Sequence, residues 1–280
     1  MQEIKNAEFG GERPLFASHH LTLDNVTIHA GESALKCCSD ITARHCRFEG
    51  KYPFWHVDKF SISDCLFTPG ARAALWYSRD LTMRDTRVEA PKMFREMDGI
   101  DLTNVVIPDA AETLWHCRNI RLRDCDIRQA DYLFMHCENI DIDRYHQEGN
   151  YSFQYTRNVV IRNAQIHSKD AFWGTEDVTV YDSTLNGEYL GWHSRRLHLI
   201  RCHIDGTQPL CYCHDLILED CTFGPEADLA FEDSTLQARL TSTPVSIKNP
   251  RSGSISLPEP CQIITDAHIL APADCKITIR

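Results

Sequence analysis

The sequence predicts an all-β fold, a right-handed parallel β-helix (solenoid) of about eleven or twelve coils with a C-terminal β cap. A short apolar motif recurs every 19 to 21 residues along most of the 280-residue chain. Such a regular repeat is typical of a solenoid. Within each motif apolar and polar residues alternate with the period of a strand. Short strands that return in register stack as parallel neighbours, and the crossover rule makes the coil right-handed.

The recurring motif begins with an apolar residue, which we number position 0, and has a second apolar residue at +2. Both are expected to point into the core, because alternate strand residues face the same side. Position 0 is occupied by Leu21, Ile41, Phe60, Leu81, Ile100, Ile120, Ile140, Val159, Val178, Leu197 and Leu216. These residues set the register from which every other position is counted.

The remaining positions of the repeat divide into bends and core. Position +4 is rich in Asn and Asp, which suit bends where side chains hydrogen-bond the local backbone. Positions +7 and −6 are almost always apolar and complete the core. Many of the thirteen cysteines fall at +5 and −3, where other coils carry small residues. Neighbours such as Cys46 and Cys65 would lie near disulfide distance, but we expect free buried thiols that fill a small volume.

The repeat divides the chain into two parts of one domain. Residues 1–233 are expected to form the β-helix. After Leu216 the strand-like segments come at closer spacing, with Pro and Gly between them. Because the end of a solenoid must cover an open edge, residues 234–280 are expected to form irregular terminal coils and a β cap.

Composition restricts the partners that the protein is expected to have. A net charge of −11 and the lack of a continuous basic strip disfavour nucleic acid, and no apolar run is long enough for a membrane span. No export signal is visible, so a cytoplasmic location is expected. No cofactor motif is recognised. The segment "CYCH" (Cys211 to His214) resembles a metal-ligand cluster, but its cysteines fit existing columns, so no metal site is predicted.

The surface positions −5 and −4 form the candidate binding site. All five tryptophans fall at −5, a position that they share with Lys36, Arg95 and Gln154, so this column is expected to face outward. Aromatic faces beside charged residues suit a chain of sugar rings. The predicted binding residues are Trp55, Trp76, Trp115, Trp173, Trp192, His56, Tyr77, His116, His136, Tyr155 and His193. Two alternatives remain open: a ladder that only stabilises the sheet, or tryptophans partly covered by loops.

The candidate catalytic residues lie in the middle of this ladder. Arg95 and Glu96 replace the recurring aromatic and His or Tyr pair there, and Lys92 and Glu112 are expected within about one coil. Two carboxylates at suitable separation would serve a glycoside hydrolase. A cationic base would instead serve a polysaccharide lyase. The alternative is an ordinary ion-pair cluster at the surface.

Several stretches resemble a bacterial family of unknown function in the pectin-lyase-like superfamily. They are "GGERPLF" (10–16), "KYPFW" (51–55), "AETLW" (111–115), "GNYSF" (149–153), "KDAFW" (169–173) and "GEYLGW" (187–192). The resemblance implies a single-stranded right-handed β-helix and supplies no catalytic residues, and a fold does not fix an activity. The sequence therefore predicts oligosaccharide binding, with cleavage left open. The alternative is a non-catalytic scaffold or protein-interaction module, and the sequence does not predict the oligomeric state.

Overall fold

The computed structural model describes residues 2–266, 270 and 272–280. The fold is all-β, a parallel β-solenoid of about 14 turns, and the fold-class prediction is confirmed. Within the described residues the sole helix is the 3₁₀ helix η1 (Pro69–Ala71), and no helix is long and apolar enough to cross a membrane. The chain divides into two compact units, residues 1–146 and 147–280, which we describe separately.

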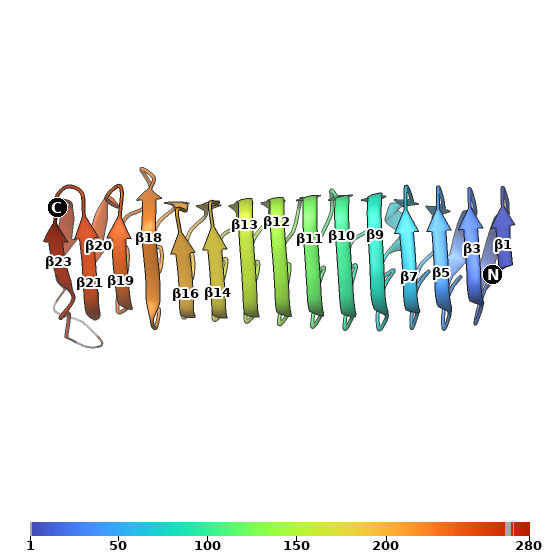
Figure 1. Ribbon diagram of the computed structural model, residues 1–280, viewed down its shortest axis with the longest axis horizontal. Helices are drawn as coiled ribbons and strands as arrows, with labels where there is room; N and C mark the ends of the chain where they lie inside the picture. Colours follow the sequence, from blue (N-terminus) through green and yellow to red (C-terminus); the bar gives the residue numbers. More distant parts are fainter. Residues whose placement is uncertain (1, 267–269, 271) are drawn as a thin grey trace. The chain divides into compact units, whose positions relative to one another are not determined.

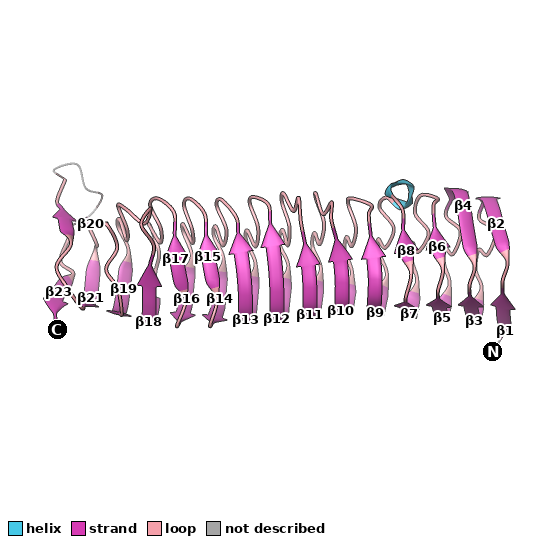
Figure 2. Ribbon diagram, turned by 90° about the horizontal axis from the view of Figure 1, so that it is seen from above, coloured by secondary structure: helices cyan, strands magenta, loops and turns pink. Residues whose placement is uncertain are grey.

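The first unit is built from parallel strands that return once per coil (Figure 1). Figure 2 shows the strands β2, β4, β6 and β8 side by side on another face. The strands are β1 (Gln2–Lys5), β2 (Glu8–Glu12), β3 (His19–Asp24), β4 (Thr27–Glu32), β5 (Ser39–Arg44), β6 (Arg47–Phe48), β7 (Asp58–Ser63), β8 (Leu66–Phe67), β9 (Arg79–Val88), β10 (Asp98–Ile107) and β11 (Arg118–Ile127). In β12 (Glu138–Glu148) the chain passes into the second unit.

The second unit repeats the same architecture. Its strands are β13 (Arg157–His167), β14 (Glu176–Tyr181), β15 (Thr184–Asn186), β16 (Arg195–Ile200), β17 (His203–Asp205), β18 (Leu216–Phe223), β19 (Thr235–Leu240), β20 (Ser246–Lys248), β21 (Ser252–Leu257), β22 (Gln262–Ile264) and β23 (Lys276–Ile279). Strands β18, β19, β21 and β23 pair in parallel one after another, and β20 pairs with β22. Parallel pairing therefore continues through the described strands of residues 234–280.

The predicted register is confirmed wherever pairings between its position-0 residues are observed. Ile41 pairs with Phe60, and Ile100 pairs with Ile120, as the repeat requires. In the second unit Val178 pairs with Leu197. The predicted number of eleven or twelve coils is too low. At the N-terminus β1 adds a coil that pairs with β3, where the polar Gln2 stands at position 0 and the half-buried Ile4 at +2.

The core consists of the inward positions of the repeat. The apolar residues at −6, such as Phe54, Phe94 and Phe172, are fully buried, and phenylalanines of adjacent coils stack on one another. The thirteen cysteines are free thiols, and most are buried. Burial raises the pKa of Cys125 to about 11, because a thiolate would lose its hydration there. These thiols act as small apolar side chains.

Bends between the faces are made by residues with left-handed backbone. The +4 positions predicted as bends have positive φ, as at Asn104 (φ 53°) and Asp124 (φ 54°). The −1 positions are bends of the same kind, although they were not predicted. Asn and Asp tolerate this conformation well, but Lys59 and Arg196 adopt it too. The fold therefore fixes the backbone at these positions while allowing different side chains.

Candidate functional site

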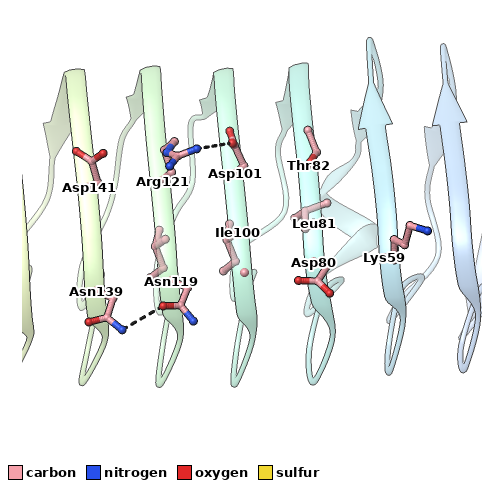
Figure 3. A pocket seen from close by; sticks show the side chains of 12 residues that line it. Lys59, Asp80, Leu81, Thr82, Ile100, Asp101, Asn119, Arg121, Asn139 and Asp141 are labelled. Carbon is pink, nitrogen blue, oxygen red and sulfur yellow. Dashed lines mark hydrogen bonds and ion pairs between the residues drawn. The ribbon is translucent and has the colours of Figure 1, made fainter.

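A polar groove lies on the strand face of the first unit, between the side chains at −1 and those at +1. The residue at position 0 points inward, so the backbone forms the floor and the flanking side chains form the walls (Figure 3). The main depression has a volume of about 590 Å³. It is lined by Lys59, Asp80, Leu81, Thr82, Gly99, Ile100, Asp101, Asn119, Ile120, Arg121, Asn139 and Asp141. We call these twelve residues the strand-face groove.

A glycine stands in the middle of the −1 row of the groove. In the coil of β10, position −1 is Gly99, which has a φ of +80°. The two neighbouring coils carry Asp80 and Asn119 at the same position. A Cβ at Gly99 would lie 2.9 Å from the Asp80 Oδ1 atom, so even alanine would crowd that carboxylate. Asp80 is exposed, and no described residue forms a hydrogen bond or ion pair with its carboxylate. The groove therefore presents an unpaired acceptor that lies over Gly99.

The rest of the groove is ordered by hydrogen bonds between adjacent coils. Asn139 Nδ2 donates to Asn119 Oδ1 at 3.1 Å, and Asn119 Nδ2 donates to Asp98 Oδ1 at 2.6 Å. Arg121 forms an ion pair with Asp101 at 3.5 Å. These contacts fix the amide and guanidinium groups in rows, so the donors and acceptors of the groove are held in place before any ligand binds.

A second, smaller depression continues the groove toward the N-terminus. It has a volume of about 290 Å³ and shares Lys59, Asp80 and Thr82 with the first. Lys59 Nζ lies 2.7 Å from Asp40 Oδ1. The hydrogen bond between them lowers the pKa of Asp40 and raises the pKa of Lys59. This part of the groove is therefore charged but internally paired.

The predicted tryptophan ladder is a continuous stack in the first unit. The rings of Trp55 and Trp76 are 5.5 Å apart and nearly parallel, at 9°. The next coil places the Arg95 guanidinium between two indoles, with Cζ 4.3 Å from the Trp76 ring centroid and 4.6 Å from that of Trp115. All three tryptophans are half-buried, as expected for an outward column.

The indoles of this stack already have protein partners. Trp55, Trp76 and Trp115 each donate Nε1–H to a backbone carbonyl of the next coil, at 2.6, 2.7 and 2.6 Å. Facing rings are covered by their neighbours, so mainly ring edges remain for a ligand. This geometry supports the structural alternative for the tryptophan column, since stacked cross-strand pairs stabilise a sheet without a ligand.

The adjacent −4 column is more exposed and is interrupted at its centre. His56 stacks on Tyr77 at 5.2 Å, and His116 stacks on His136 at 5.1 Å. Burial and the neighbouring imidazole lower the pKa of His136. The coil between the two ring pairs carries Glu96.

A depression of about 460 Å³ opens at this interruption. It is lined by Glu96, Met97, Asp98, His116 and Arg118. Arg118 pairs with Asp98 at 2.9 Å, and this hydrogen bond lowers the pKa of Asp98. Asp98 also accepts the hydrogen bond from Asn119, so this depression borders the strand-face groove.

The four predicted catalytic residues are not brought together as one reactive cluster. Lys92 Nζ lies 3.0 Å from both carboxylate oxygens of Glu112, which is an ordinary ion pair. Arg95 is held between the indoles, and Glu96 lines the depression just described. Of the four, Glu96 is the exposed acid that faces an open volume.

The second unit contains its own part of the predicted ladder. Trp173 and Trp192 have ring centroids 5.4 Å apart, and Trp192 Nε1 donates to the Gln208 carbonyl at 2.8 Å. His193 stacks on Tyr212 at 5.1 Å. Burial, followed by the charge of His214, lowers the pKa of His193. Tyr155, in the same −4 column, is exposed. The unit also has a depression of about 420 Å³ at its own −1 and +1 positions, lined in part by Asp177, Arg196 and His198.

In the segment "CYCH" the two cysteines lie in the core, and Tyr212 and His214 are half-buried. Cys211 and Cys213 are buried, and their thiols donate to backbone carbonyls such as those of Leu229 and Gly191. No group of three or more His, Cys, Asp or Glu side chains in the described part of the chain is placed to hold a metal ion.

Comparison with known proteins places the chain in a family. The solved structures that resemble it include PfbA, a surface adhesin of Streptococcus pneumoniae, at 9% identity and a TM-score of 0.43, covering 84% of this chain and 81% of that one. They also include the A-module of mannuronan C-5 epimerase AlgE4 of Azotobacter vinelandii, at 10% identity and a TM-score of 0.36, covering 99% and 88%. Likeness at this level carries no inference about activity.

No curated protein matches the chain. The family described as "Protein of unknown function (DUF3737)" matches residues 2–278, almost the whole sequence. The protein therefore belongs to the DUF3737 family, and its fold is a parallel β-solenoid.

Proposed function

We propose that the protein binds an oligosaccharide in the strand-face groove of residues 1–146. The observation that carries this proposal is the composition of the groove. Its walls are carboxylate, amide, hydroxyl and cationic side chains in adjacent rows, around a depression of about 590 Å³. Most small-molecule pockets are lined by apolar groups. A groove with polar walls instead suits a ligand that carries many hydroxyl groups.

The donors and acceptors of the groove match such a ligand. A sugar hydroxyl both donates and accepts, so it can bridge a carboxylate and an amide or cationic group. Asp80 offers an unpaired carboxylate, which lies over Gly99 of the next coil. Asn119 and Asn139 present amides on the same side of the opening. Adjacent coils repeat this arrangement, which favours an extended ligand over a compact one.

The aromatic ladder has a supporting role in this proposal. The tryptophan faces are covered by one another, whereas His116 and Glu96 line a depression that borders the groove through Asp98. If the bound sugar is also cleaved, Glu96 is the group that we assign to proton transfer, because Lys92 and Glu112 pair with each other. Proton transfer by a positioned carboxylic acid is a common contribution to glycoside hydrolysis.

Two substitutions test the binding proposal. Gly99→Asn introduces the side chain that the next coil carries at this bend, and asparagine tolerates positive φ. We expect it to displace the Asp80 carboxylate and reduce affinity for the best glycan of a panel at least about tenfold, equivalent to about 1.4 kcal/mol. Asp80→Asn should also weaken binding. The matched control is Asp64→Asn, which makes the same change at an exposed +4 bend of this unit.

The measurement is calorimetric titration of the intact protein with each glycan. Affinity unchanged in both groove variants, or no binding by any glycan, would overturn the proposal and leave the scaffold alternative. Cleavage is tested separately by product release with Glu96→Gln. If glycan binds and products form at the unchanged rate in this variant, Glu96 has no part in the chemistry.

A further inference from the structure

We infer that Arg95 is a binding site for an oxyanion, a carboxylate or a phosphate or sulfate group, held through the two terminal nitrogens of its guanidinium. This site is separate from the strand-face groove and does not depend on oligosaccharide binding. It lies in the −5 column between Trp76 and Trp115.

The two indoles hold the guanidinium in place. Its Cζ atom is 4.3 Å from one ring centroid and 4.6 Å from the other, on adjacent coils. Both indoles are themselves anchored by hydrogen bonds to backbone carbonyls. A planar guanidinium held between two rings keeps few conformations, so little entropy remains to be lost when it binds a ligand. The rings also exclude water from both faces, which strengthens an electrostatic contact at the open edge.

Arg95 has no anionic partner among the residues that the structure describes. No described residue forms an ion pair with Arg95 or accepts a hydrogen bond from it, and its cationic neighbour Lys92 is paired with Glu112. Most other arginines of the solenoid bind a carboxylate, as Arg118 binds Asp98 and Arg201 binds Asp182. In a chain with net charge −11, a half-buried arginine without a carboxylate is the exception.

One donor of Arg95 breaks a general rule of protein interiors. Its Nε atom is buried and has no hydrogen-bond partner. Buried donors are almost always paired, and an unpaired one is destabilising because it has lost its hydrogen bond to water. A residue that served stability alone would not need this arrangement, and such local violations occur at functional sites. Because Nε is covered, a ligand must approach the terminal nitrogens.

The terminal nitrogens determine the chemical class of the ligand. Two parallel N–H groups match two oxygens of one carboxylate, sulfate or phosphate, and such charge-assisted pairs are stronger than neutral hydrogen bonds. Lysine in the same column is not equivalent. Lys36 Nζ lies 5.7 Å from the Trp55 ring centroid, in the same column. Its ammonium group is a point charge and lacks the two parallel N–H groups of a guanidinium.

The test is titration of the intact protein with sodium acetate, phosphate and sulfate, followed by tryptophan fluorescence at constant ionic strength maintained with sodium chloride. We expect a saturable change with at least one of the three anions and none with chloride alone. Acetate distinguishes a carboxylate site from one for tetrahedral anions. The response should weaken at least tenfold in Arg95→Gln and remain in the matched control Lys36→Gln.

Two results would overturn the assignment. One is the absence of any saturable response in the unmodified protein, and the other is an unchanged midpoint in a folded Arg95→Gln variant. If circular dichroism shows that Arg95→Gln is unfolded, Arg95→Lys replaces it and should show weaker binding, because lysine lacks the fork of parallel donors. Glycan binding in the groove should be unaffected by Arg95→Gln, so failure of one proposal does not imply failure of the other.

Discussion

A Cβ atom on Gly31 would lie 2.0 Å from the carbonyl oxygen of Gly11 on the preceding coil. The two residues pair across β2 and β4, so the contact is with backbone that cannot rotate away. At this point the coils approach so closely that the chain requires a residue without a side chain.

Gly31→Ala should therefore destabilise the first unit by about 1–3 kcal/mol, the range found when extra atoms are forced into tight packing. The matched control is Gly10→Ala. A Cβ there would meet only the Cβ of His29, at an ordinary 3.6 Å. Urea unfolding of both variants measures the difference, and equal free energies of unfolding would refute the predicted clash.

Phe48→Ala should remove a central part of the core. The Phe48 ring is fully buried and packs on Phe54 at 5.0 Å and on Phe67 at 4.8 Å. Loss of a buried phenylalanine costs about 3–5 kcal/mol through lost burial and a residual cavity. Phe16→Ala, at a ring that is 45% exposed, is the control and should have a much smaller effect on the melting temperature.

The N-terminal coils contain a pH-sensitive contact at His29. Hydrogen bonds with Glu8 and then Glu49 raise the pKa of His29, and the hydrogen bond from Arg47, followed by that from His29, lowers the pKa of Glu49. The histidine contribution to stability is present below its usual pKa and is lost as pH rises through the raised value. The Glu49 contribution is present above the usual carboxyl pKa and is lost as pH falls through the lowered one.

We therefore expect this contact to be strongest in mildly acidic solution, between the two titrations. NMR titration of the His29 ring should give a midpoint above 6.5, the ordinary value for histidine. Glu8→Gln combined with Glu49→Gln should lower that midpoint, whereas Glu12→Gln should leave it in place. A His29 midpoint that does not respond to the double substitution would contradict the assigned cause.

Adjacent cysteines should differ in reactivity. Cys37 is exposed, whereas Cys38 is buried, and burial raises the pKa of Cys38 to about 11. Because the thiolate is the reactive form, a thiol-specific reagent at neutral pH should label Cys37 first. Mass spectrometry of partly labelled native protein checks the order. Cys37→Ser should remove the fastest phase, and modification of Cys38 at the same rate would contradict the burial argument.

Much of the fold is predictable because the core follows a strict repeat. Apolar residues at position 0, such as Ile41 and Ile120, identify the register that the strands adopt. The additional turns escape this reasoning for a physical reason. Gln2 in the first coil is exposed at the end of the stack, and the last coils vary in length, so neither shows the regular apolar spacing.

The site is less predictable, because surface positions carry no periodic hydrophobicity. The tryptophan column is recognisable from the repeat, because all five tryptophans fall at −5, but the sequence alone does not show that Trp55 and Trp76 cover each other's faces. The groove was missed, because its −1 wall mixes Lys59, Asp80 and Asn119. A signal was present: Asn, Asp and Gly recur at −1, which indicates left-handed bends and hence a second aligned row of side chains.

The tolerance of the −1 bends has an evolutionary consequence. Residues as different as Lys59, Asn119 and Arg196 adopt almost the same left-handed backbone there. Substitutions at −1 can thus change the chemical character of the surface in one coil at a time without changing the backbone beneath it. Relatives that share this solenoid can therefore differ in the side chains that they display at these bends, since a single substitution changes one row of the surface and leaves the stacking of the coils unchanged.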